Sequence, residues 1–212
     1  MPAIAVNDLA GDNSSGTSWD MTYNLCDGLD ISALLAPPKL VTAADILDDR
    51  TVVPDVGGIY GWWFNAELPD VPTEGTQSNE GYRLLYVGIA PRAPSAEGSR
   101  SSSTLRKRIV RNHLASRIAS STLRRSLAWI LSETLNLTIN RNAAGKATMS
   151  RDDEARLTMW MSRYAAVSFL PHESAWQIEQ ALVGSGTPTL PINIKGAGHE
   201  FKARLSAMRM GR

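Results

Sequence analysis

Glu179 is the residue whose position most strongly indicates chemistry, because it is an acid on the apolar side of a predicted helix. At about 100° per residue, the apolar residues of this helix form one stripe, and Glu179 falls in the middle of it. The stripe consists of Ala175, Ile178, Leu182 and Val183. A carboxylate that faces a protein core costs several kcal/mol unless it is paired, protonated or bound to a cation. We therefore expect Glu179 either to bind a cation or to form a salt bridge with an arginine.

Two tripeptides place tyrosines near the ends of two strand-like runs: Gly58-Ile59-Tyr60 and Tyr86-Val87-Gly88. A predicted helical segment that carries Arg108 follows the second run. Taken singly, the tyrosines also fit ordinary core packing, and Arg108 also fits a solvated helix face.

Taken in order, five features of the chain resemble the GIY-YIG nuclease family over about residues 57–208. They are the two tripeptides, the segment Leu105-Arg106-Lys107-Arg108-Ile109, Glu179 on a late helix and Asn193 in the loop beyond it. The resemblance implies a metal-dependent endonuclease that hydrolyses phosphodiester bonds of DNA. The order of predicted elements indicates an α+β fold in which a small, mostly antiparallel, three-stranded sheet is flanked by helices.

By this resemblance, Glu179 would hold one divalent cation, Mg²⁺ or Mn²⁺, whose other ligands would be waters and phosphate oxygens. Tyr60 and Tyr86 would line the site, and one of them, with Tyr60 as the first choice, would take or orient the proton of the attacking water. Because the reference pKa of tyrosine is about 10, this phenol would need positive charge nearby, which Arg108 would supply. Arg108 would stabilise the charge of the transition state. Asn193 would brace the site or position a phosphate; the alternative is an ordinary turn residue.

The chain departs from the family pattern at the histidine. Members of the family commonly place a histidine four residues after the arginine, whereas here Asn112 occupies that position and His113 follows one residue later. In an ideal α-helix, His113 would lie about 140° around the axis from Arg108. A one-residue π-bulge would restore a shared face, and Arg106, seven residues before His113, would share its face without a bulge. We expect Arg108 to be the catalytic arginine because the Leu-x-x-Arg-Ile spacing around it matches the family pattern. Whether His113 takes part in catalysis stays open.

These residues must be positioned by a few strands and helices. We predict strands at residues 57–64, 83–89 and 165–170, with a hairpin around residues 142–145. We predict helices from about 104 to 118, 122 to 133, 152 to 164, 174 to 183 and 200 to 208, and a short helix capped by Thr42. The helix at 174 begins with a capping box formed by Ser174 and Gln177.

Alternation along the first two strands predicts which side chains share a face. In the first strand, Tyr60, Trp62 and Phe64 lie on one face, and Ile59 and Trp63 lie on the other. In the second strand, Leu84 and Tyr86 lie on one face, and Leu85, Val87 and Ile89 lie on the other. If the strands are antiparallel, both tyrosines can point to the same side.

Charge is divided unevenly along the chain. Residues 1–80 hold two basic and 13 acidic side chains, net −11, and residues 81–212 hold 20 basic and eight acidic ones, net +12, which together give the overall +1. A basic body of this kind is typical of a protein whose partner is rich in phosphate, and a solvated, arginine-rich surface is the alternative. Our candidates for contact with nucleic acid, most simply DNA, are basic residues around the site: Arg92, Arg100, Arg106, Arg117, Arg124, Arg125, Lys195, His199 and Lys202.

Composition indicates three segments. We expect disorder over residues 1–18, an acidic extension that packs on the body over residues 19–56, and a nuclease-like domain over residues 57–212. The single Cys26 cannot form an internal disulfide, and no stretch approaches the roughly 20 apolar residues of a membrane span. We therefore expect a cytoplasmic protein without membrane association.

Three alternatives to an active DNA endonuclease stay open. The chain could be a nucleic-acid-binding module with little or no activity, which the displaced His113 would explain. It could also cleave RNA, single strands or particular nucleic-acid structures. Finally, the acidic first part could cover the basic body and regulate it.

Overall fold

The computed structural model describes residues 29–94, 101–193 and 199–210. The predicted disorder of residues 1–18 lies outside these ranges, and the predicted extension over residues 19–56 is described from Leu29 onward. Within the described ranges, no helix is both long and apolar enough to cross a membrane.

An antiparallel sheet of five strands lies at the centre of the described part, in the order β1-β7-β2-β4-β3. Its strands are β1 (Val41–Thr42), β2 (Gly58–Phe64), β3 (Ser78–Asn79), β4 (Tyr82–Ala90) and β7 (Ala165–Pro171). The prediction of three strands is wrong in number, although β2, β4 and β7 match the three predicted strands. The other two have two residues each, which is too short for the alternation that identifies a strand in a sequence. A separate hairpin of β5 (Asn140–Arg141) and β6 (Ala147–Thr148) forms where one was predicted.

Strand β2 is buried along its whole length, and its two faces belong to different clusters, as predicted. Tyr60, Trp62 and Phe64 lie in the larger cluster, and Ile59 and Trp63 lie in the smaller one. Because both faces are covered, the strand reads as a continuous apolar run between two helical layers.

Strand β4 departs from the predicted alternation at a β-bulge. Its register passes from Tyr86 opposite Trp62 to Leu84 opposite Trp63, so Leu85 is the extra residue. Leu85 and Tyr86 therefore both pack against the larger cluster, and Leu84 belongs to the smaller one. The prediction that Leu84 and Tyr86 share a face is wrong, because the bulge shifts the alternation by one residue.

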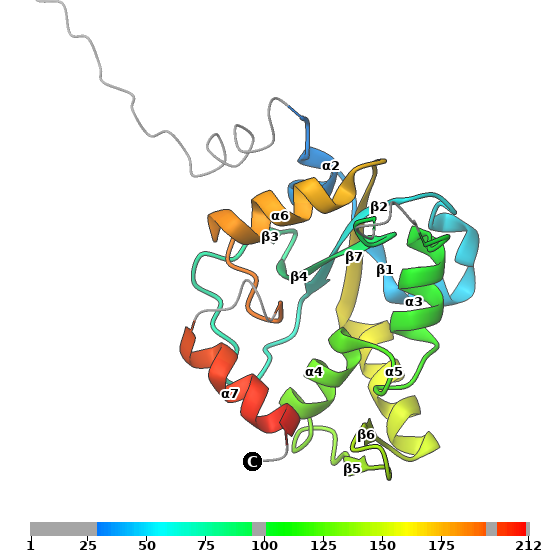
Figure 1. Ribbon diagram of the computed structural model, residues 1–212, viewed down its shortest axis with the longest axis vertical. Coiled ribbons are helices and arrows are strands. Elements are labelled where there is room, and N and C mark those ends of the chain that lie inside the picture. The colour runs from blue at the N-terminus through cyan, green and yellow to red at the C-terminus, as the bar shows by residue number, and fades with distance from the viewer. Residues whose placement is uncertain (1–28, 95–100, 194–198, 211–212) are drawn as a thin grey trace, which may run out of the picture.

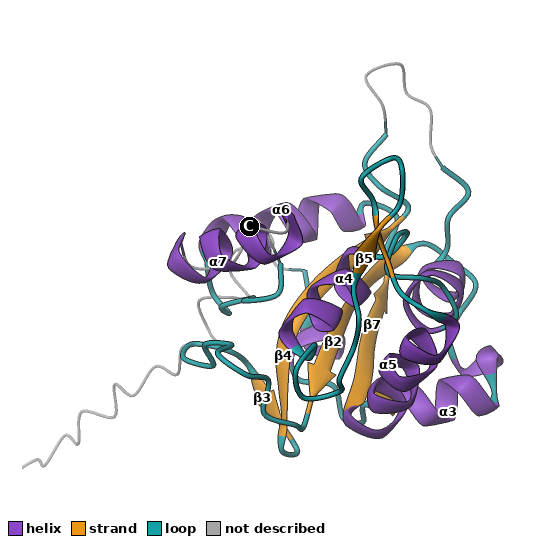
Figure 2. Cartoon of the chain, turned by 90° about the horizontal axis from the view of Figure 1, so that it is seen from below, coloured by secondary structure: helices purple, strands orange, loops and turns teal. Residues whose placement is uncertain are grey.

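Helices cover both faces of the sheet, so the sheet is the middle of three layers (Figures 1 and 2). The larger cluster is covered by α3 (Ala43–Asp48), η2 (Lys107–Leu114), α4 (Thr122–Ile130) and α5 (Arg151–Tyr164). The smaller cluster is covered by α2 (Ser32–Leu35) and α6 (Ala175–Ser185). A 3₁₀ turn, η1 (Arg50–Val52), follows α3, and α7 (His199–Met210) packs against α4.

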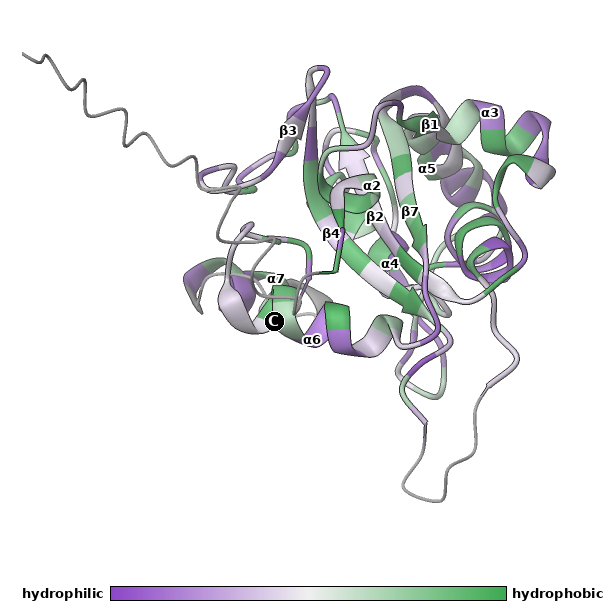
Figure 3. Cartoon of the chain, turned by 90° about the horizontal axis from the view of Figure 1, so that it is seen from above, coloured by the Kyte–Doolittle hydropathy of each residue, from purple (hydrophilic) through white to green (hydrophobic). Residues whose placement is uncertain are grey.

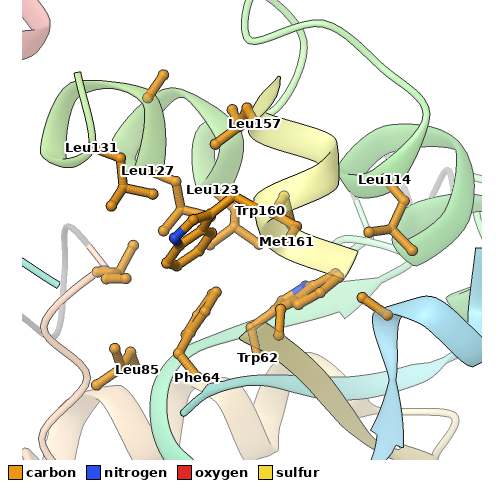
Figure 4. Packing of buried hydrophobic residues seen from close by; sticks show 14 of the residues in the cluster. Trp62, Phe64, Leu85, Leu114, Leu123, Leu127, Leu131, Leu157, Trp160 and Met161 are labelled. Atoms are coloured by element: carbon orange, nitrogen blue, oxygen red, sulfur yellow. The ribbon is translucent and has the colours of Figure 1, made fainter. Parts of the chain in front are cut away.

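The larger cluster is the main core. Trp62 and Phe64 project from β2 toward Trp160 and Met161 of α5, and leucines of α4 close the cluster from above (Figure 4). Phe64 and Trp160 stack with ring centroids 5.9 Å apart. In Figure 3 hydrophobic residues appear along the three long strands and on helices such as α2 and α6, whereas α3 also includes hydrophilic stretches.

The segment before β2 is tied to the rest of the structure at several points. Leu34 and Leu35 of α2 are buried in the smaller cluster, and the Ser168 hydroxyl donates to the Leu34 carbonyl at 2.7 Å. Farther along, the Val56 carbonyl accepts the backbone N–H of Leu105 at 2.8 Å. This last bond satisfies one of the free N–H groups at the start of the helical segment that carries Arg108.

The two predicted helix caps have different outcomes. The Thr42 hydroxyl accepts the backbone N–H of Asp45 at 3.1 Å, as predicted. Ser174 precedes α6, but its side chain makes no capping bond. Instead the backbone N–H of Ser174 donates to Nδ1 of His172 at 3.0 Å, so His172 orders this helix entrance.

Candidate active site

The ring of Tyr60 lies across Gly88 of the neighbouring strand. The two residues are direct partners in the β2–β4 register, and a side-chain carbon added at Gly88 would overlap the Tyr60 phenol. Only glycine leaves room for the ring at this position. The glycine of the second tripeptide is therefore what lets the tyrosine of the first lie flat on the sheet.

The two tyrosines point to the same side of the sheet and meet at His113. The ring centroid of His113 is 5.5 Å from that of Tyr60 and 6.1 Å from that of Tyr86. The antiparallel register sets this arrangement, because Tyr86 lies opposite Trp62, which shares a face with Tyr60. The structure thus brings together two strands and the helical segment that follows them.

That helical segment is a π-helix, η2, rather than the α-helix predicted to Ile118. Its hydrogen bonds join residues five apart, as in the bond from the Ala115 N–H to the Val110 carbonyl at 2.9 Å. Residues five apart, such as Arg108 and His113, consequently share a face. The wider turn places His113 on the sheet side despite the extra residue in the sequence.

His113 is buried and hydrogen-bonded through both ring nitrogens. Its Nε2 lies 2.7 Å from the Tyr60 hydroxyl oxygen, and its Nδ1 lies 2.8 Å from the hydroxyl oxygen of Ser121. Burial, together with the nearby charges of Arg108 and Arg124, lowers the pKa of His113 to about 3. The imidazole is therefore neutral at physiological pH.

Burial raises the pKa of both tyrosines, that of Tyr60 well above its usual value. The charge of Glu179 raises both pKa values further, and the charge of Arg108 lowers both. A hydrogen bond with the Thr122 side chain also lowers the pKa of Tyr86. Because Arg108 and Glu179 each act on both phenols, these four side chains form one electrostatic group.

The acid and the arginine of this group are both partly buried, and they come from opposite layers. Glu179 belongs to α6, on the side of the smaller cluster, and Arg108 belongs to η2, on the other side. Nε of Arg108 is buried and makes no hydrogen bond with the described residues. A buried donor without a partner is costly, and a phosphate oxygen would satisfy it.

The donors of this group fit a hard divalent cation. They comprise one carboxylate and two phenol oxygens, whereas both nitrogens of His113 are already used. Among the described residues, no three or more His, Cys, Asp or Glu side chains gather as a metal site. A single carboxylate with oxygen neighbours suits a cation that keeps several waters, and it does not suit zinc.

Asn193 braces the free edge of β4. Its side-chain amide donates to the Val87 carbonyl and accepts the Val87 N–H, both at 2.7 Å. The backbone N–H of Ile192 adds a bond to the Leu85 carbonyl at 3.0 Å. Because its amide is occupied by the strand that carries Tyr86, we expect Asn193 to position that strand rather than a phosphate.

The prediction that Arg124 contacts nucleic acid is wrong, because its side chain is 0% exposed. Its guanidinium pairs with Glu154 at 2.8 Å and donates to the His113 carbonyl at 3.2 Å. It also donates to the carbonyl of Leu114, the last residue of η2. Arg124 thus holds the C-terminal end of the π-helix, where helix carbonyls lack partners.

The other predicted nucleic-acid contacts fall into three groups. Arg106 is directed to the segment before β2, since its Nε donates to the Val53 carbonyl at 2.7 Å and its guanidinium lies 4.0 Å from Asp55. Arg125 is half-buried and donates to two backbone carbonyls. Three candidates have exposed side chains: Arg92, Arg117 and Lys202. Arg100, Lys195 and the side chain of His199 lie outside the described part.

Sequence reasoning missed the part that three residues play: Ser121 and Thr122 were not named, and Arg124 was expected to contact nucleic acid instead. The first two begin α4, so their serine and threonine types predicted a helix start and nothing more. For Arg124 a signal was available, because at about 100° per residue it lies only about 20° from Leu131 on the apolar side of α4. That is the same observation that drew attention to Glu179.

A family model described as the GIY-YIG catalytic domain matches residues 58–211. The match begins at the first residue of β2 and includes every element that carries a residue of the site. No curated protein and no solved structure matches the chain.

Proposed function

The chain belongs to the GIY-YIG catalytic domain family, and from that premise we propose that it is an endonuclease that hydrolyses phosphodiester bonds of DNA with one divalent cation, Mg²⁺ in particular. The observation that carries the proposal is the common influence of Arg108 and Glu179 on the two facing tyrosines. A carboxylate that can hold a cation, a positive guanidinium and two phenols within reach of both charges are groups that phosphodiester hydrolysis can use.

Glu179 is the proposed cation ligand. When bound, the cation would polarise the scissile phosphate and offset the carboxylate charge that raises the pKa of both tyrosines. Mg²⁺ is the first choice because it commonly binds through one or two carboxylates while keeping waters and substrate oxygens.

Tyr60 is the proposed partner of the attacking water. Its hydroxyl is held by His113 at 2.7 Å, so the oxygen has a set position over the sheet. Burial keeps the phenol protonated in the free protein, and Arg108 opposes that effect. Tyr60 therefore orients the water while its phenol is protonated. It could accept the water's proton only after releasing its own proton to bulk water, which positive charge around the phenol would favour.

Arg108 is the proposed partner of the phosphate. Its buried Nε has no hydrogen-bond partner among the described residues, so the fold leaves this donor unsatisfied, although the side chain as a whole is only partly buried. A guanidinium can bind two phosphate oxygens at once and stabilise the charge that develops on them.

Charge supports a nucleic-acid substrate, and DNA is the form that the family resemblance implies. Residues 81–212 carry net +12, and Arg92, Arg117 and Lys202 have exposed side chains that phosphates can reach. The alternative of a binding module without activity was motivated by the displaced position of His113. That motivation is weaker here, because in the π-helix His113 contacts Tyr60.

A substrate panel tests this proposal. Double-stranded DNA, single-stranded DNA and RNA of one sequence are incubated with the protein in Mg²⁺, Mn²⁺ or a chelator. We expect cleavage of DNA with either cation and none with the chelator. Cleavage that continues in the chelator would refute the divalent cation, and cleavage of RNA alone would refute the substrate.

A further inference from the structure

A chain of hydrogen bonds joins Tyr60 and His113 to Ser121, the residue before α4. The exposed fractions of the three side chains are 1%, 3% and 2%. Ser121 also caps α4, because its hydroxyl oxygen accepts the backbone N–H of Arg124 at 3.2 Å. In this dry setting, each hydrogen needs an acceptor within the protein.

The position of the hydrogen on Ser121 decides the tautomer of His113. If the Ser121 hydroxyl donates to Nδ1, the imidazole hydrogen must be on Nε2, from which it donates to the Tyr60 oxygen. If Nδ1 carries the hydrogen instead, the Ser121 oxygen accepts it, and the serine hydrogen has no acceptor in the part of the chain that the structure describes. A buried, unpaired hydroxyl is the costlier arrangement.

The rest of the chain accommodates the first arrangement. With Nε2 donating, the hydrogen of Tyr60 can turn toward Tyr86, a hydrogen-bonding neighbour that acts on the pKa of Tyr60. The side chain of Thr122, the neighbour of Ser121, acts on the pKa of Tyr86 in the same way.

We propose that Ser121 is a positioning residue that holds His113 as the Nε2-protonated tautomer, so that His113 donates a hydrogen bond to Tyr60 and does not take its proton. The effect of His113 on catalysis rests on the proposed function. The tautomer of His113 does not, because it is a property of the folded protein. A neutral N–H donor at this place stabilises negative charge on the Tyr60 oxygen.

The electrostatics around His113 agree with this assignment. A proton acceptor for Tyr60 would become an imidazolium, and the burial and neighbouring arginines that lower the pKa of His113 to about 3 oppose that charge. Arg124 contributes twice, since it also binds the His113 carbonyl and so fixes the ring from its backbone.

The direct test is nitrogen NMR of protein labelled with ¹⁵N in its histidines, which number three. The His113 signals are identified by their loss in His113→Gln, and their shifts show which nitrogen carries the hydrogen. We expect a protonated Nε2 and an unprotonated Nδ1 in the wild type and in Ser121→Thr, which keeps the hydroxyl. Ser121→Ala should lose this single tautomer. Protonated Nδ1 in the wild type, or an unchanged spectrum in Ser121→Ala, would overturn the proposal.

Cleavage kinetics of His113 variants show whether His113 donates a hydrogen bond to Tyr60 or accepts its proton. Glutamine can place an N–H near the position of Nε2, but it cannot accept the Tyr60 proton. We expect kcat of His113→Ala to fall about 100-fold or more, with His113→Gln recovering at least about tenfold of that loss and KM changing little in either. Equal loss in the two variants contradicts the donor role. If the wild type cleaves nothing, the proposed function fails while the NMR result still decides the tautomer.

Discussion

Single residues control whether the two tyrosines can meet. Gly88 leaves room for the Tyr60 ring, and Nε2 of His113 lies 2.7 Å from the Tyr60 hydroxyl oxygen. Each of these residues has an ordinary structural reading when taken alone. Their combination explains why the two tripeptides, whose tyrosines are 26 residues apart in the sequence, act as one feature.

Replacing Gly88 by alanine should displace Tyr60 and reduce cleavage. The added carbon would overlap the phenol, so the ring must move, and a shift of about 1 Å can cost about 100-fold in rate. Stability should fall by about 1–3 kcal/mol. The control is Gly184→Ala in α6, where the new carbon meets nothing within 4 Å. We expect this control to keep the wild-type cleavage rate; an equally active Gly88→Ala would contradict the packing argument.

Among the elements, the π-helix η2 has the clearest functional consequence. It absorbs the one residue by which the Arg108–His113 spacing exceeds the family pattern. Arg124 stabilises its end by donating to the carbonyls of His113 and Leu114. The extra residue is thus accommodated locally, and the neighbouring helices need not move.

Deleting Asn112 should therefore preserve activity. The deletion leaves four residues from the arginine to the histidine, which an ordinary α-helix places on one face. We expect cleavage within about tenfold of wild type and an unchanged or higher melting temperature, because π-helical turns are rare and less favourable. An alanine inserted after Arg111 is the control, since it moves the histidine to six residues away. If the insertion is active and the deletion is not, the role assigned to the π-helix is wrong.

The sequence predicted the long strands, the two faces of β2 and most helix positions, because these follow from periodic patterns. It did not predict the bulge at Leu85, the π-helix or the His172 bond to the Ser174 backbone. These features depend on tertiary contacts that override local periodicity. The residues proposed for the site could be named from the sequence, but the link from His113 to Ser121 could not, because it joins two separate helical elements.

Across the whole molecule, the segment before the family match contributes to the core. Leu34 and Leu35 are buried in the smaller cluster, and Val41 and Thr42 add an edge strand to β7. Asp55, one of the acidic residues of this segment, hydrogen bonds to Thr104 beside the start of the π-helix. Removing this segment would therefore lower the stability of the fold. Such a deletion could not show by itself whether the acidic segment covers the basic residues.

Two N-terminal deletions distinguish the residues that pack against the smaller cluster from those predicted to be disordered. Removal of residues 1–40 exposes the smaller cluster, and the loss of several buried leucine contacts should cost about 5 kcal/mol, or about 10–20 °C in melting temperature. Removal of residues 1–18, which the sequence predicts to be disordered, should leave the melting temperature unchanged. Thermal denaturation followed by circular dichroism measures both. An unaffected melting temperature in the longer deletion would contradict the packing of α2.

The most direct test of the proposed chemistry is Glu179→Gln, with DNA cleavage and DNA binding measured on the same protein in Mg²⁺. The substitution keeps the size of the side chain and removes the charge that a divalent cation needs. We predict that cleavage falls by about 100-fold or more while binding stays within a few-fold, and that Glu173→Gln, an exposed acid just before α6, changes neither. Cleavage by Glu179→Gln at the wild-type rate would contradict the central claim that this carboxylate holds the catalytic cation.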